Sequence, residues 1–116
     1  MESSPPPMPP EPPAGSGDLL DQVLEPLLED FAASFRRGQE LVAACPERVM
    51  AAAERERFAH RLQQASAELA AARALRAAAP VPMALEMETI TPWHQLVLEV
   101  WSLSAALRAA GALPER

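Results

Sequence analysis

The chain has 116 residues, 49% of them hydrophobic, and a formal net charge of −6 at neutral pH. This length allows a single domain, and because much of the hydrophobic fraction is alanine, few large apolar side chains are available for a core. Acids and bases are unevenly placed: residues 2–30 carry acids and no base, whereas bases are interleaved with acids over residues 36–76. Phosphate binding needs a continuous basic surface, so this pattern predicts no nucleic-acid binding.

The residues that usually carry chemistry are scarce and scattered. Cys45 is the single cysteine, which excludes an internal disulfide and a cysteine-based zinc site. Glu56 and His60 stand four residues apart, but no third and fourth metal ligand accompanies them. No glycine-rich phosphate loop and no nucleophile motif is present. We therefore expect a protein that is not an enzyme and has no catalytic residue, metal site or cofactor.

Residues 1–17 are predicted to form a disordered, proline-rich tail. Seven prolines fall within residues 5–13, which favours polyproline II over helix or strand. The PxxP spacings lack a neighbouring base, so a solubilising tail and a docking motif both stay open. The sequence has no basic leader followed by an apolar run and no apolar stretch of membrane-spanning length. We expect an intracellular protein, cytoplasmic or nuclear.

The first predicted helix begins at Asp18, a good N-cap residue. One stripe of apolar residues then repeats with helical spacing: Leu20, Leu24, Leu27, Leu28, Phe31, Phe35 and Val42. Pro26 interrupts this helix, because proline removes a backbone hydrogen bond and clashes with the preceding turn at a cost of about 3 kcal/mol. The prediction is a kink near residues 24–25 or a helix that restarts at Pro26.

Cys45 and Pro46 predict a tight turn, followed by a second helix over about residues 46–79. This helix carries the 4-3 spacing of a coiled-coil seam, which Arg76 interrupts: Phe58, Leu62, Ala65, Leu69, Ala72 and Ala79. A short turn between two long helices predicts an antiparallel hairpin over residues 18–79. Folding the chain back at Cys45 gives four expected pairs: Arg37 with Glu54, Asp18 with Arg73, Leu28 with Leu62, and Leu20 with Leu69 or Ala72.

Residues 80–90 are expected to connect the hairpin to a last helix. Their alternating apolar residues favour an extended strap, although a loop or an extra helical turn also fits. Thr91 as cap and Pro92 at the first position predict a third helix over residues 91–110, which ends before Gly111 and leaves a tail of residues 111–116. Its apolar residues cover more than half of its circumference, which exceeds what packing on one hairpin requires.

Together these patterns predict an all-α fold: a long antiparallel helical hairpin, a third amphipathic helix and a disordered tail. The excess apolar surface predicts a non-enzymatic adaptor or small subunit of a multi-protein complex that acts through coiled-coil-like contacts with a helical protein partner. The seam spacing also suits a homo-oligomer. The candidate interface residues are Phe58, Leu62, Leu69, Trp93, Val97, Val100, Trp101 and Leu107. The alternative function is an amphipathic lipid- or membrane-surface binder, which the scarcity of bases beside the third helix disfavours.

Overall fold

A computed structural model of the chain describes residues 16–78 and 87–114. Within these ranges the protein is all-helical, with three helices and no strand: α1 (Ser16–Ala43), α2 (Ala52–Ala78) and α3 (Met87–Ala109). The all-α class predicted from the sequence is therefore confirmed. Residues 1–15 of the predicted tail and residues 80–86 of the predicted strap lie outside the described residues, whereas residues 16 and 17 belong to α1 rather than to the tail.

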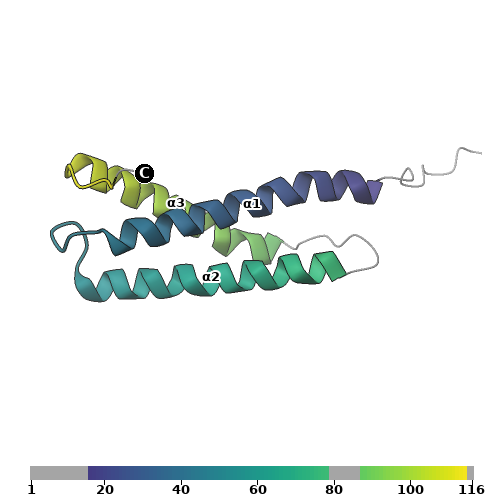
Figure 1. The fold of residues 1–116 in the computed structure, drawn as a ribbon, viewed down its shortest axis with the longest axis horizontal. Helices are drawn as coiled ribbons and strands as arrows, with labels where there is room; N and C mark the ends of the chain where they lie inside the picture. Colours follow the sequence, from purple (N-terminus) through teal and green to yellow (C-terminus); the bar gives the residue numbers. More distant parts are fainter. Residues whose placement is uncertain (1–15, 79–86, 115–116) are drawn as a thin grey trace, which may run out of the picture.

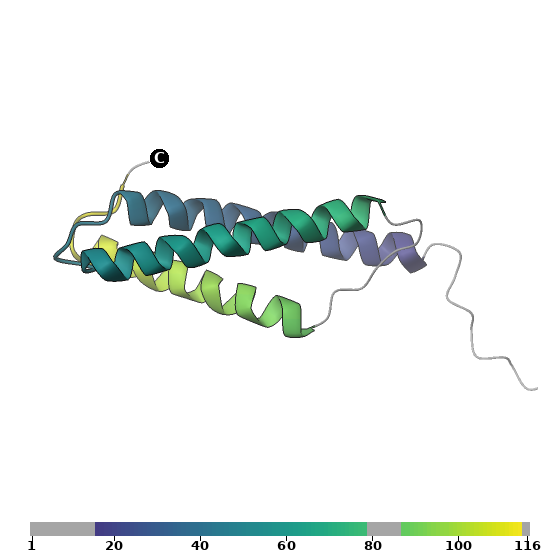
Figure 2. The same cartoon turned by 90° about the horizontal axis from the view of Figure 1, so that it is seen from below.

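The three helices lie side by side, with α1 and α3 running in one direction and α2 in the other (Figures 1 and 2). Helix α3 covers the end of the α1–α2 pair that contains the turn between them. At the opposite end, the first part of α1 and the last part of α2 extend beyond α3. This difference between the two ends determines which apolar side chains are buried.

The core lies where all three helices meet, and its buried residues come from every helix. They are Leu28, Phe31, Phe35, Leu41, Val42, Cys45, Phe58, Leu62, Ala65, Leu69, Trp93, Leu96, Val97, Val100, Leu103 and Leu107. Three aromatic rings pack together within it: Phe31 stacks on Phe35 at 6.1 Å between centroids, and Trp93 meets Phe31 edge-on at 5.8 Å.

Pro26 does not divide the first helix, because α1 continues through it. The predicted restart at Pro26 is therefore wrong. Proline removes the hydrogen bond that would end on the carbonyl of Gln22, and both residues lie on the exposed side of α1. A carbonyl at an exposed position can be hydrated, which lowers the cost of the missing bond.

The turn after α1 is longer than the sequence predicts, so α2 begins at Ala52 rather than near Pro46. The amides of Val49 and Met50 both donate to the carbonyl of Pro46, at 3.0 and 3.2 Å, which closes a turn over the residues expected to start the helix. Arg55 Nη1 then donates to the carbonyl of Cys45 at 3.0 Å and fastens α2 to the end of α1.

The longer turn shifts the pairing of α1 with α2. Leu62 lies against Gly38 instead of opposite Leu28, and Arg73 forms its ion pair with Glu25, seven residues beyond the expected Asp18. Arg37 pairs with Glu40 in its own helix at 3.3 Å, so the predicted Arg37–Glu54 pair is wrong. Each of these differences from the predicted pairing arises because the turn is longer than predicted, so that α2 starts at Ala52.

Helix α3 begins at Met87, earlier than predicted, so Thr91 is not its cap and residues 87–90 are helical rather than extended. Pro92 lies inside the helix, more than one turn after its start, so α3 lacks the backbone hydrogen bond that would end on the carbonyl of Glu88. The predicted stop is confirmed: Gly111 has a φ of 67°, its amide donates to the carbonyl of Arg108, and the amide of Ala112 donates to that of Leu107. These bonds form a Schellman cap.

Candidate functional site

The candidate interface residues from the sequence divide sharply by burial. Seven of them are in the core: Phe58, Leu62, Leu69, Trp93, Val97, Val100 and Leu107. Trp101 is the exception, with 61% of its surface exposed, whereas Trp93 is 2% exposed. We therefore restrict the interface proposal to the face of α3 that carries Trp101.

Trp93 is held in the core by contacts of its aromatic ring and by a hydrogen bond from its indole N–H group. Its ring packs against Phe31 of α1, and its indole Nε1 donates a hydrogen bond to Glu68 Oε2 of α2 at 3.3 Å. A buried indole needs such an acceptor for its N–H group. This arrangement makes Trp93 the residue that joins α3 to both other helices, which assigns it a structural role.

The opposite face of α3 presents a second line of residues with coiled-coil spacing. Steps of three, four, three, four and three residues join its six exposed members, which we call the outer seam: Thr91, His94, Leu98, Trp101, Ala105 and Arg108. Leu98 is 43% exposed and lies one helical turn from Trp101. The sequence contains this spacing, but the stripe that faces the core has similar periodicity and masks it.

The outer seam carries little charge for a chain with a net charge of −6. Arg108 is its one permanently charged residue, and of the exposed residues that flank the seam on one side, Glu88 is charged whereas Gln95, Ser102 and Ala109 are not. The carboxylate of Glu99 turns away from the seam, toward Arg61 of α2. Depletion of charge around exposed aromatic and aliphatic side chains is typical of the centre of a protein–protein interface.

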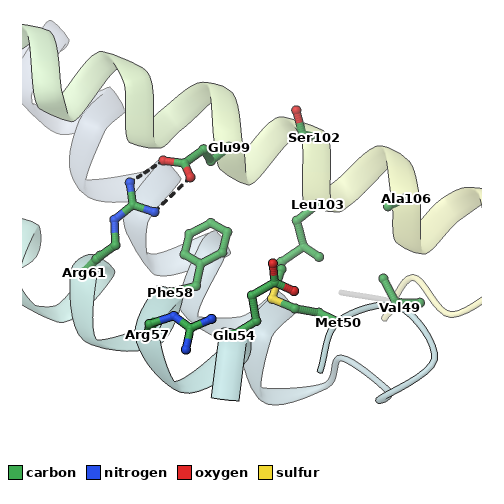
Figure 3. A pocket seen from close by; sticks show the side chains of 10 residues that line it. All are labelled: Val49, Met50, Glu54, Arg57, Phe58, Arg61, Glu99, Ser102, Leu103 and Ala106. Carbon is green, nitrogen blue, oxygen red and sulfur yellow. Dashed lines mark hydrogen bonds and ion pairs between the residues drawn. The ribbon is translucent and has the colours of Figure 1, made fainter. Parts of the chain in front are cut away.

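A groove of about 490 Å³ lies between α2 and α3, with Phe58 and Leu103 among its lining residues (Figure 3). Arg61 of α2 donates two hydrogen bonds to Glu99 of α3 at one end of it, the first at 2.8 Å from Nη1 to Oε1. The hydrogen bond to the Glu99 carboxylate raises the pKa of the Arg61 guanidinium, because it favours the charged form of the arginine. Glu54 and Arg57 also line the groove.

The ionisable side chains that line the groove are two carboxylates and two guanidinium groups. Its acids and bases are Glu54, Arg57, Arg61 and Glu99, and it contains no histidine or cysteine. Across the described ranges, no three residues of the His, Cys, Asp and Glu types come close enough to hold a metal ion. The thiol of Cys45 is buried in the core and does not line this groove. We take the outer seam as the candidate site because it carries the exposed side chains of Trp101 and Leu98.

No helix in residues 16–78 or 87–114 is long and apolar enough to cross a membrane. A family model described as a protein of unknown function (DUF2605) matches residues 14–109, which include all three helices and the outer seam. No curated protein and no solved structure matches the chain.

Proposed function

The chain belongs to the DUF2605 family, and from its surfaces we propose that it is a non-enzymatic helical subunit or adaptor of a protein assembly. In this proposal α1 and α2 form an antiparallel hairpin that supports α3, and the outer seam of α3 binds a helical protein. An intracellular location, cytoplasmic or nuclear, is part of the same proposal.

The exposure of Trp101 is the observation that carries the proposal. Tryptophan is the residue type most enriched at binding hot spots, and burial of an exposed tryptophan and leucine contributes several kcal/mol to an interface. The core already contains Trp93 for its own packing, so Trp101 is not needed to fill it. Helix–helix contact also matches the heptad-like spacing of the outer seam.

Size fractionation of a cell extract tests the proposal. The tagged chain should elute well above its monomer mass, and Trp101→Glu should shift it to the monomer position. Leu75→Glu is the matched control, because Leu75 is 58% exposed but lies on α2, away from the seam. Monomer elution of the unaltered chain, or a large complex that survives Trp101→Glu, would contradict the proposal.

Vesicle flotation separates this proposal from lipid binding. Surface-binding helices usually carry several lysines or arginines on the polar face, and the outer seam has only Arg108. We expect the purified chain to stay with the soluble fraction when mixed with vesicles of anionic and neutral lipids. Flotation that is lost in Trp101→Glu would replace the protein-binding proposal with the lipid-binding one.

A further inference from the structure

We propose that the outer seam binds the same seam of a second copy of this chain, so that two α3 helices pack antiparallel in a twofold dimer. This inference rests on the proposed function and identifies a second copy of the chain as a helical partner of the outer seam. It follows from the order of residues along the seam, from their sizes and from their charges.

The spacing of the seam reads the same in both directions. Its steps of three, four, three, four and three residues are symmetric about a point between Leu98 and Trp101. An antiparallel second copy therefore places every seam residue opposite another seam residue. A twofold interface requires this kind of self-complementarity, because the same patch must serve on both subunits.

The antiparallel arrangement also matches large side chains with smaller ones. Trp101 of one copy faces Leu98 of the other, and His94 faces Ala105. Each level of the seam then combines a bulky residue with one that leaves room for it, as close helix packing requires. A parallel pair would instead place the two Trp101 rings at one level and the two Ala105 side chains at another.

Charge disfavours the parallel arrangement as well. Parallel packing sets the Arg108 guanidinium groups of the two copies against each other, which is unfavourable for like charges. Antiparallel packing places each Arg108 opposite Thr91, about 26 Å along the helix from the other Arg108. No pair of like charges meets along the seam, although each copy carries a net charge of −6.

Because the outer seam is small, we expect the dimer to be weak. A single helix pair of this length buries less than the ~1,200 Å² found in stable interfaces. The helix is already folded within its own domain, however, so association does not have to supply the free energy of helix formation. A reversible dimer that forms as the concentration rises is the expected result.

Sedimentation velocity of the purified full chain tests the dimer. The weight-average mass should rise from one chain to two across the micromolar range, and Trp101→Glu or Leu98→Glu should abolish the rise. Both substitutions lie on exposed positions, and unchanged far-UV circular dichroism would verify the fold. Leu75→Glu should dimerise like the unaltered chain. A monomer at every concentration, or a dimer that persists in Trp101→Glu, overturns the inference.

Cysteine cross-linking tests the orientation in a Cys45→Ala background, which removes the native thiol. Mixing His94→Cys with Ala105→Cys should give a mixed disulfide faster than either variant alone gives a homodimer. Faster self-linking of Ala105→Cys would indicate parallel packing and overturn the antiparallel dimer. A purified monomer whose complex in extracts still requires Trp101 would refute this inference alone, whereas a purified dimer with no larger assembly in extracts would refute the proposed function.

Discussion

Gly38 determines how closely the three helices approach one another at the centre of the core. A Cβ atom at this position would lie 2.7 Å from Cγ2 of Val100 and 3.0 Å from Cδ2 of Leu62. Both distances are shorter than ordinary van der Waals contact. The side chains of Leu62 and Val100 therefore occupy the space that a side chain at position 38 would need. Glycine weakens a helix, but here that local cost permits the tight packing of three elements.

Gly38→Ala should destabilise the protein even though alanine is the better helix former. Alanine gains about 0.5–1 kcal/mol of helix propensity, while overpacking a tight core costs about 1–3 kcal/mol. We expect a net loss of about 1–2 kcal/mol in the free energy of unfolding, measured by urea denaturation. Val100 is β-branched and stiff, so it cannot easily rotate away from the new methyl group.

A double-mutant cycle provides the control for Gly38. Val100→Ala removes the nearest atom, so Gly38→Ala should cost much less in that background than in the unaltered chain. Equal costs in both backgrounds, or a more stable Gly38→Ala protein, would show that the three helices do not approach each other as closely as described.

Glu25 is the residue that joins the uncovered end of α1 to α2. Its carboxylate accepts a hydrogen bond from Arg73 Nη2 at 2.6 Å and another from Arg76 Nη1 at 2.8 Å. The Arg73 hydrogen bond, with a smaller contribution from Arg76, lowers the pKa of Glu25 below its ordinary value of 4.5. The ionised carboxylate is therefore favoured in the folded state.

This pKa shift predicts a pH-dependent contribution to stability. Because the folded-state pKa is the lower one, the stabilisation is complete above about pH 4.5 and disappears as the pH falls through the folded-state value. Glu25→Gln should lower the free energy of unfolding at neutral pH by less than about 1 kcal/mol, since the pair is partly exposed. Its difference from the unaltered chain should vanish in acid.

Urea denaturation at several pH values measures this effect. Glu56→Gln is the matched control, because Glu56 is an exposed carboxylate on α2 that lies outside the Glu25 ion pairs. A difference between Glu25→Gln and the unaltered chain that stays constant down to strong acid would contradict the proposed ion pairs.

At the scale of a single element, α3 has two apolar faces with separate roles. Trp93, on the inner face, contacts both other helices, while Trp101, on the outer face, is exposed. The sequence predicts the excess of apolar surface on this helix. It does not predict which tryptophan is inside, because that depends on where α1 and α2 lie around α3.

Alanine substitution of the two tryptophans should change the stability of the protein by very different amounts. Trp93→Ala empties a site at the centre of the core and should cost about 3–5 kcal/mol of unfolding free energy. Trp101→Ala should change stability by less than about 0.5 kcal/mol, because the side chain is largely exposed. Thermal melts monitored by circular dichroism at a concentration low enough to keep the chain monomeric measure both. Similar losses for the two variants would mean that Trp101 is part of the core.

At the scale of the whole molecule, local signals in the sequence predict elements better than they predict the register between them. The apolar stripes and Gly111 correctly place three helices and the end of α3. The pairing of α1 with α2 depends on how many residues the turn consumes. Pro46 can start a helix or hold a turn, and the turn is favoured here by the bonds that Val49 and Met50 make to its carbonyl.

The same register leaves one end of the molecule with two helices instead of three. Val23 and Leu27 in the first half of α1 and Leu75 near the end of α2 are exposed. The first part of α1 and the last part of α2 extend beyond α3 at this end (Figure 1). The other end of α2 is secured by Arg55, and the turn before it is tied to the end of α3 because Arg48 Nη2 donates to the carbonyl of Ala110 at 3.2 Å. Stability should therefore be unequal along α2.

Hydrogen exchange should reveal this gradient. The amides of Phe58 and Leu62 lie in the three-helix core and should exchange only through near-global unfolding, whereas those of Ala72 and Leu75 should exchange through local opening at a smaller free energy. Adding low concentrations of urea should accelerate exchange at Phe58 and Leu62 more strongly, since their opening exposes more surface. Equal protection and equal urea dependence along α2 would mean that the two-helix end is as stable as the core, and that something other than α3 covers its exposed leucines.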